Sequence, residues 1–118
     1  MKTVKVSVGE LSGIALDWAV AKCEGDHEAD DPDKHDDWDL LPYSDTWVLG
    51  GPIIEREGMD LRHHGVDSRN GRTHWRASIQ WLDEADFEGI GPAPLIAAMR
   101  CYVASKLGND VEIPKELL

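Results

Sequence analysis

Alternation of apolar and polar residues marks the strands that the sequence predicts. Over residues 72–81 the alternate positions read Thr, Trp, Ala, Ile, Trp, a period of two that indicates a strand with one buried face. Residues 59–64 form a second candidate strand, and Asn70-Gly71 between the two is typical of a tight hairpin turn, because both turn positions favour positive φ. Shorter alternation over residues 3–8 and 111–113 predicts edge strands. The pattern therefore predicts a small antiparallel sheet.

Apolar residues that recur every three or four positions predict helices over residues 10–23 and 94–107. Gly25 suits the left-handed position just beyond the first helix. Gly13 inside that helix would let a neighbouring element approach closely. Residues 83–93, which precede the last helix, are expected to be a polar connection.

A third helix is predicted in the middle of the chain, where Ser44 is a good N-cap and Gly58 ends the segment. Pro52 lies between them, and a proline is costly inside a helix but cheap in its first turn. Two alternatives stay open: one kinked helix over residues 45–57, or a short turn followed by a helix that begins near Pro52. Together with the strands, these segments predict an α+β domain in which about three helices pack on a small antiparallel sheet, made of the hairpin 59–64/72–81 and the edge strands.

Length and composition indicate a single domain over residues 1–118. The 118 residues are 42% hydrophobic, enough for a core without disulfides or metal. No apolar run approaches the roughly 20 residues of a bilayer span, and the first residues lack the apolar segment of a signal peptide. We therefore expect a cytoplasmic protein that contacts no membrane, in which Cys23 and Cys101 stay reduced and act as small buried hydrophobes.

The net charge of −11 is distributed unevenly. Residues 1–55 carry four Lys and thirteen acids, net −9; residues 56–81 carry five Arg and three acids, net +2; residues 82–118 carry three basic residues and seven acids, net −4. Nucleic-acid binding depends on neutralising phosphates, so direct binding to nucleic acid is excluded as a general function. The arginine-rich middle segment is still suited to holding a small anion.

The most acidic stretch, about residues 24–40, is expected to be a mobile loop. Its opening resembles a calcium loop, but Asp31 and Asp37 stand where such a loop needs glycine and a bidentate glutamate. A solvated loop is favoured over a mimic of nucleic-acid phosphates, which would display its charge on rigid elements. As the alternative, the acidic interaction surface would comprise Asp30, Asp31, Asp33, Asp36 and Asp37.

The histidines do not predict a metal site. With a two-residue turn at Asn70-Gly71, Asp67 would face His74, and His63 would lie about 13 Å further along the first strand at ~3.3 Å per residue. His63 and His64 would point to opposite faces of the sheet, whereas metal ligands must converge. We therefore expect no metal or other cofactor. Nor does the sequence contain a nucleophile elbow, a phosphate loop or a dinucleotide fingerprint, so no catalytic residue is predicted.

Arginine and tryptophan suggest the strongest candidate site. Arginine binds phosphate through two parallel hydrogen bonds, and tryptophan stacks on bases. The alternative interpretation is that the tryptophans fill the core and the arginines pair with the many acids. The candidate ligand-binding residues are Trp47, Arg56, Arg62, Trp75, Arg76 and Arg100.

Four segments carry a resemblance to a known family: ELSGIALDWAVAKCEG, YSDTWVLGGPIIERE, WRASI and GPAPLIAAMRCYVASKLG. In this order they resemble the NinX-type proteins of lambdoid phages, and their skeleton is similar to small phage proteins of the α/β/α-sandwich type. The resemblance implies a sheet covered on both faces. It also implies an accessory phage protein in the cytoplasm of the infected host, without an activity or catalytic residues that can be transferred.

Three functions follow as hypotheses. The first is a non-enzymatic counter-defence protein that sequesters a nucleotide-like small anion, with a homo-oligomer as one form of the binder. The second is an acidic inhibitor or nucleic-acid mimic that binds a host defence or DNA-processing protein. The third is a small accessory enzyme of phage replication. Family analogy, and not chemistry, connects these hypotheses to host defence.

Overall fold

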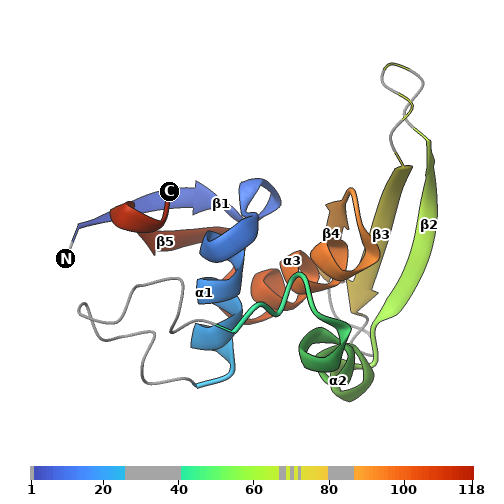
Figure 1. Ribbon diagram of the computed structural model, residues 1–118, viewed down its shortest axis with the longest axis horizontal. Helices are drawn as coiled ribbons and strands as arrows, with labels where there is room; N and C mark the ends of the chain where they lie inside the picture. The colour runs from blue at the N-terminus through green and yellow to red at the C-terminus, as the bar shows by residue number, and fades with distance from the viewer. Residues whose placement is uncertain (1, 26–40, 67–68, 70, 72, 80–86) are drawn as a thin grey trace.

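The computed structural model describes residues 2–25, 41–66, 69, 71, 73–79 and 87–118. Its helices and strands follow one another along the chain as Figure 1 shows. They are β1 (Thr3–Ser7), η1 (Val8–Glu10), α1 (Gly13–Cys23), α2 (Trp47–Glu57), β2 (Asp60–Val66), β3 (Thr73–Ile79), β4 (Phe87–Gly91), α3 (Pro94–Leu107), β5 (Asp110–Pro114) and η4 (Lys115–Leu117).

The strands confirm the α+β class but form two separate antiparallel sheets. One sheet pairs β1 with β5, and the other has the order β2-β3-β4. The expected polar connection over residues 83–93 is wrong in part, because β4 lies within it and pairs with β3. The edge strands at 3–8 and 111–113 are confirmed, and they pair with each other rather than with the hairpin.

Helix α3 is the centre of the core. It lies between the two sheets and packs against β4, β3, α1 and α2 (Figure 1). Its buried side chains recur around much of the helix, because neighbours cover it from several directions. The fully buried set on α3 is Ala97, Ala98, Met99, Cys101, Tyr102 and Val103.

Two glycines let α3 approach the outer strand of the larger sheet. A Cβ atom on Gly89 would lie 2.2 Å from the Ala97 carbonyl oxygen, and one on Gly91 would lie 3.1 Å from the Ala97 nitrogen. Any side chain at Gly89 would therefore collide with the helix backbone. The close approach expected at Gly13 occurs here instead, since a Cβ on Gly13 would meet no atom within 4 Å.

The first helix begins later than predicted. Gly13 is the first residue of α1 and has φ of 55°, a value that favours glycine, while η1 occupies part of the segment before it. The prediction that Gly13 lies in the helix interior is therefore wrong. Gly25 follows the helix with φ of 77°, which confirms the predicted left-handed position.

The middle helix is continuous through Pro52, as the first of the two alternatives held. Its N-cap is Thr46, so the prediction for Ser44 is wrong: the backbone N–H of Ser44 donates instead to the side chain of Asp17. Gly58 ends the helix in the left-handed conformation with φ of 64°. The glycine signal therefore located this helix end better than the serine signal located its start.

The hairpin register differs from that of a two-residue turn. Strand β2 ends at Val66 and β3 begins at Thr73, and these two residues pair with each other. A bulge lies between His63 and Gly65. The predicted pairing of Asp67 with His74 is therefore wrong, because His74 pairs with Gly65. Six residues, 67–72, separate Val66 from Thr73, so the pairs nearest the turn already differ from those of a two-residue turn. The bulge then shifts the pairs from His63 to Asp60 by one further position.

The larger sheet has one covered face and one open face. Alternation along β3 places Ala77 and Ile79 against α3, where both are buried, as the period-two pattern predicted; Trp81 lies outside the described residues. The opposite face carries Arg62, Arg76 and Ile90 in one row. Since Arg62 and Ile90 are exposed, the expectation of a sheet covered on both faces does not hold for the described part of the chain.

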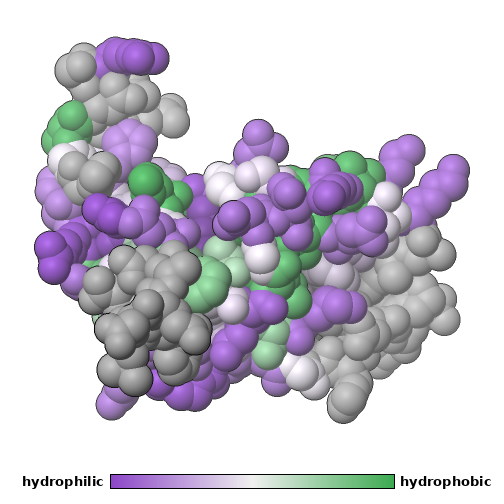
Figure 2. Space-filling model, turned by 180° about the vertical axis from the view of Figure 1, so that it is seen from behind, coloured by the Kyte–Doolittle hydropathy of each residue, from purple (hydrophilic) through white to green (hydrophobic). Residues whose placement is uncertain are grey.

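The surface is largely hydrophilic. Seen from behind, the described residues at the surface are mostly hydrophilic, and apolar ones gather toward the middle of the view (Figure 2). Exposed apolar side chains such as Val48, Val66 and Ile90 belong to three different elements. Among the helices that the structure describes, none has both the length and the apolar content that a bilayer crossing demands.

Candidate functional site

A cavity of about 460 Å³ lies where the two sheets approach each other beside α3. One wall is β4, the opposite wall is the end of β1 with η1, and α3 contributes Arg100 and Ala104. We call this the inter-sheet cavity; its lining comprises residues 7–9 and 88–90, with Arg100, Ala104 and Asn109. Gly9 leaves room in the β1 wall, where a Cβ atom would lie 3.9 Å from the Ser7 Oγ, whereas the side-chain position of Gly89 is taken up by the backbone of α3.

Arg100 is held in this cavity by two backbone carbonyl groups. Its Nε donates to the Leu11 carbonyl at 2.9 Å, and Nη1 donates to the Ile90 carbonyl at 2.7 Å. Among the described residues no carboxylate pairs with it. Burial lowers the pKa of Arg100, yet an arginine remains protonated at neutral pH. The cavity therefore contains a positive charge that no described acid neutralises.

Arg56 lies elsewhere, in a network that joins the C-terminal ends of three helices. Its guanidinium contacts Glu24 at 2.7 Å and Glu57 at 3.0 Å, and donates to the Tyr102 hydroxyl at 3.0 Å. Lys106 lies 3.5 Å from Glu57, and the Tyr102 hydroxyl donates to Glu24. The bonds from Arg56 hold the pKa of Glu24 below its ordinary value. Since the charges match within the network, its geometry suits stabilisation of the helix ends.

Arg62 and Arg76 are neighbours on the open face of the larger sheet. They are register partners across β2 and β3, and each forms an ion pair. Arg62 lies 2.8 Å from Asp60, and Arg76 pairs with Glu88. This agrees with the alternative interpretation that the arginines pair with acids. An anion on this face would have to displace a carboxylate from each arginine.

The two candidate tryptophans lie apart. Trp75 is partly buried on the α3 side of β3, with its ring 5.2 Å from that of His63 in an edge-on arrangement. Trp47 begins α2 and is 53% exposed. Trp75 therefore contributes to the core, and Trp47 is available at the surface. Of the predicted ligand-binding residues, Arg100 is the one that lines the inter-sheet cavity.

Metal and thiol chemistry find little support in the described residues. No group of three or more His, Cys, Asp or Glu side chains is placed to hold a metal ion in that part of the chain. Burial raises the pKa of both Cys23 and Cys101 to about 12, which suppresses the nucleophilic thiolate. The predicted acidic surface, from Asp30 to Asp37, lies outside the described residues.

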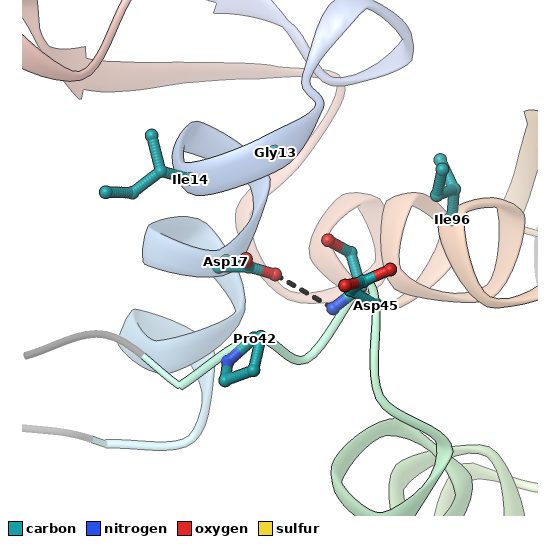
Figure 3. A pocket seen from close by; sticks show the side chains of 7 residues that line it. Gly13, Ile14, Asp17, Pro42, Asp45 and Ile96 are labelled. Carbon is teal, nitrogen blue, oxygen red and sulfur yellow. Dashed lines mark hydrogen bonds between the residues drawn. The ribbon is translucent and has the colours of Figure 1, made fainter. Parts of the chain in front are cut away.

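A second cavity of about 350 Å³ contains a residue that the sequence did not single out, Asp17. Asp17 projects from α1 toward the turn before α2, where its carboxylate accepts the backbone N–H of Ser44 at 2.8 Å (Figure 3). Asp45 lines the same cavity, together with apolar side chains that include Ile14 and Ile96. Burial raises the pKa of Asp17, so the site favours its neutral form.

Asp17 anchors the turn to the helix, and one sequence signal could have revealed it. It stands as the single charged residue in the otherwise apolar run from Ile14 to Ala21. A charged side chain buried in such a run needs a hydrogen-bond partner. The partner here is a backbone group far along the chain, which no local pattern identifies.

Comparison with known proteins identifies a family to which the chain is similar. A family model described as bacteriophage P22, NinX, matches residues 7–106. A search of curated proteins finds no match. The matched region includes α1, α2, the three-stranded sheet and nearly all of α3.

Proposed function

Because the chain belongs to the NinX family of bacteriophage P22, we propose that it is a non-enzymatic phage accessory protein that binds a host factor, and that this factor is a small anion of the nucleotide class. Binding without turnover would remove such a molecule from the host and so counter a defence that depends on it. The proposal takes the inter-sheet cavity as the binding site and Arg100 as its central residue.

The observation that carries the proposal is the charge state around Arg100. In a chain of net charge −11, the other candidate arginines, Arg56, Arg62 and Arg76, each pair with a carboxylate. Arg100 instead bonds to two neutral carbonyls. A guanidinium has five N–H donors, so three remain for a ligand. An anion that accepts them would neutralise a charge that the protein leaves unmatched.

The dimensions of the cavity fit a small molecule. Ligand sites in proteins enclose roughly 300–1,000 Å³, and this one encloses about 460 Å³. Ser7 and Asn109 add polar groups to its lining, and Gly9 leaves room beside them. Glu88 also lines the cavity, but its carboxylate pairs with Arg76, which reduces repulsion of an incoming anion.

Native mass spectrometry of the purified chain, before and after incubation with a small-molecule filtrate of infected cells, tests the proposal. Isothermal titration with a panel of mono-, di- and cyclic nucleotides identifies the class. We expect a stoichiometric adduct of a few hundred daltons, as a nucleotide would give, with no turnover. Arg100→Gln should weaken binding about 10- to 100-fold, the effect of one charge-assisted hydrogen bond.

Arg100 also stabilises the fold, so loss of binding in an Arg100 variant has two explanations. A substitution elsewhere in the cavity lining separates ligand binding from stability. Asn109→Asp adds a negative charge at the cavity without touching the bonds of Arg100, so it should weaken anion binding at least about tenfold. Thr3→Asp adds the same charge on β1, away from the cavity lining, and should bind like the parent. Neutralising the five aspartates between Asp30 and Asp37 should also leave binding unchanged.

Three results would contradict the proposal. No adduct with either the filtrate or the panel rejects the small-anion site. Loss of host-cell activity on neutralising the acidic stretch, with Arg100 variants still active, would favour the acidic inhibitor. Conversion of a panel compound into product would favour the enzyme hypothesis.

A further inference from the structure

The two edges of the larger sheet differ in what covers them. At the β4 edge, the Ile90 carbonyl accepts a hydrogen bond from Arg100, and α3 and η1 lie against the strand. At the other edge, β2 forms the outer margin of the molecule (Figure 1). Edge strands with unpaired backbone groups are templates for a further strand. The β2 edge is therefore the side on which the sheet can grow.

The outward backbone groups of β2 follow from the bond at Ile90. Backbone groups alternate in direction along a strand, and the Ile90 carbonyl points away from β3. Its register partner Arg76 therefore directs its backbone toward β2, where it meets Arg62. By the same alternation, Leu61 and His63 direct their N–H and C=O groups away from the sheet. Within the described residues, nothing accepts or donates to these outward groups.

We propose that β2 pairs antiparallel with β2 of a second copy of this chain, about a two-fold axis at Leu61. In this register Leu61 exchanges two backbone hydrogen bonds with Leu61 of the second copy. Asp60 then stands opposite Arg62 of the second copy, and Arg62 opposite its Asp60. Such pairs bring Cα atoms to about 4.5 Å and side chains close together on the same face. The edge is thus complementary to itself in both backbone and charge.

The side chains needed for this contact are accessible. The side chain of Arg62 is 75% exposed and that of Asp60 is 49% exposed, and within one chain they already form an ion pair of 2.8 Å. Joining two copies places two arginines and two aspartates in an alternating arrangement on the open face. Two three-stranded sheets would become one sheet of six strands.

Four features limit this association to a weak, closed dimer. The bulge after His63 ends the regular edge on one side. On the other side, the Met59 N–H already donates to the Ile54 carbonyl, so it offers no donor to a second copy. A two-fold contact also uses the same edge on both copies and leaves none for a third. Repulsion between chains of net charge −11 opposes the contact except where salt screens it.

Sedimentation equilibrium of the full chain at about 0.15 M salt, over concentrations up to about 1 mM, tests the proposal. We expect reversible formation of a dimer. Arg62→Asp places an aspartate opposite Asp60 of the other copy at both pairs across the axis, and should weaken the dimer about tenfold or more. The exchange Asp60→Arg with Arg62→Asp restores opposite charges across the axis and should restore the dimer. Lys5→Asp makes the same charge change on β1, in the other sheet, and should leave the dimer unchanged.

The outcomes are distinct. Monomers at every concentration overturn the proposal. A dimer that survives Arg62→Asp, or that the double exchange fails to restore, uses another surface and overturns it as well. Circular dichroism of each variant confirms folding, which substitutions at these exposed positions should preserve. Nucleotide binding by the inter-sheet cavity does not enter this test, so the two proposals stand or fall separately.

Discussion

Replacing Gly89 by alanine tests whether the contact between β4 and α3 holds the core together. The new Cβ atom would lie 2.2 Å from the Ala97 carbonyl oxygen and 2.4 Å from the Cys101 nitrogen, whereas ordinary contact begins at 3.4 Å. Both obstacles are backbone atoms, so no side-chain rotation relieves them. Strand and helix must separate by about 1 Å, in an interior that is as densely packed as a crystal.

The cost should be near the upper end of the range for overpacked cores, about 3 kcal/mol. A chain of 118 residues has an unfolding entropy of about 0.25 kcal/mol/K. The melting temperature should therefore fall by about 12 °C. Urea denaturation followed by circular dichroism should show a lower midpoint with an unchanged slope, since the surface exposed on unfolding is the same.

Gly9→Ala is the matched control. Gly9 lies in η1 without a positive φ, and a Cβ atom there would lie 3.9 Å from the Ser7 Oγ, which is an ordinary contact. The same substitution should leave the stability unchanged or raise it by up to ~1 kcal/mol, because alanine restricts the unfolded chain. If Gly89→Ala is as stable as the parent, β4 and α3 do not touch at this position and the contact does not hold the core together.

Three further predictions concern single polar contacts. Burial raises the pKa of Asp17, so its ionised form lowers the stability of the fold above that pKa. Asp17→Asn keeps an acceptor for the Ser44 N–H, so in thermal scans its melting temperature should match or exceed that of the parent at about pH 7 and lose this advantage near pH 4. Bonds from Arg56 hold the pKa of Glu24 below its ordinary value, so Glu24→Gln should cost up to ~1 kcal/mol of stability at about pH 7, a cost limited by the exposure of Arg56. The cost should shrink as acid protonates Glu24, which urea titrations at about pH 7 and at acidic pH measure. Arg100→Lys cannot reach both carbonyls with one ammonium group and should lose ~1–3 kcal/mol in chemical denaturation.

Regular periodicity made most of the fold predictable. The alternation along β3 and the apolar recurrence in α3 reflect burial on defined faces, so they are visible in the sequence. Strand β4 was missed because its sequence, Phe-Glu-Gly-Ile-Gly, has glycines at two of its inward positions. These two positions carry no side chain because the backbone of α3 lies directly against the strand there. A pattern of side chains cannot reveal a contact that backbone atoms make.

The candidate site was predictable only in part. The sequence identifies Arg100 as a positively charged candidate, but it cannot show that Arg100 bonds to backbone carbonyls and not to a carboxylate. Arg56 and Arg76 were equally strong candidates in the sequence, and tertiary structure gives each a carboxylate. Asp17 was missed because its partner, Ser44, belongs to another segment of the chain.

The pairing of β1 with β5 has a consequence for synthesis of the chain. Ser7 pairs with Asp110, so nearly the whole domain must emerge from the ribosome before the smaller sheet can form. Until then β1 lacks its partner strand, and the buried residues of α1 lack α3 to cover them. Contacts so distant in sequence are slow to form, and unpaired edges attract other chains. The nascent protein therefore passes through a period in which chaperones can bind it, and that period ends only when β5 is released.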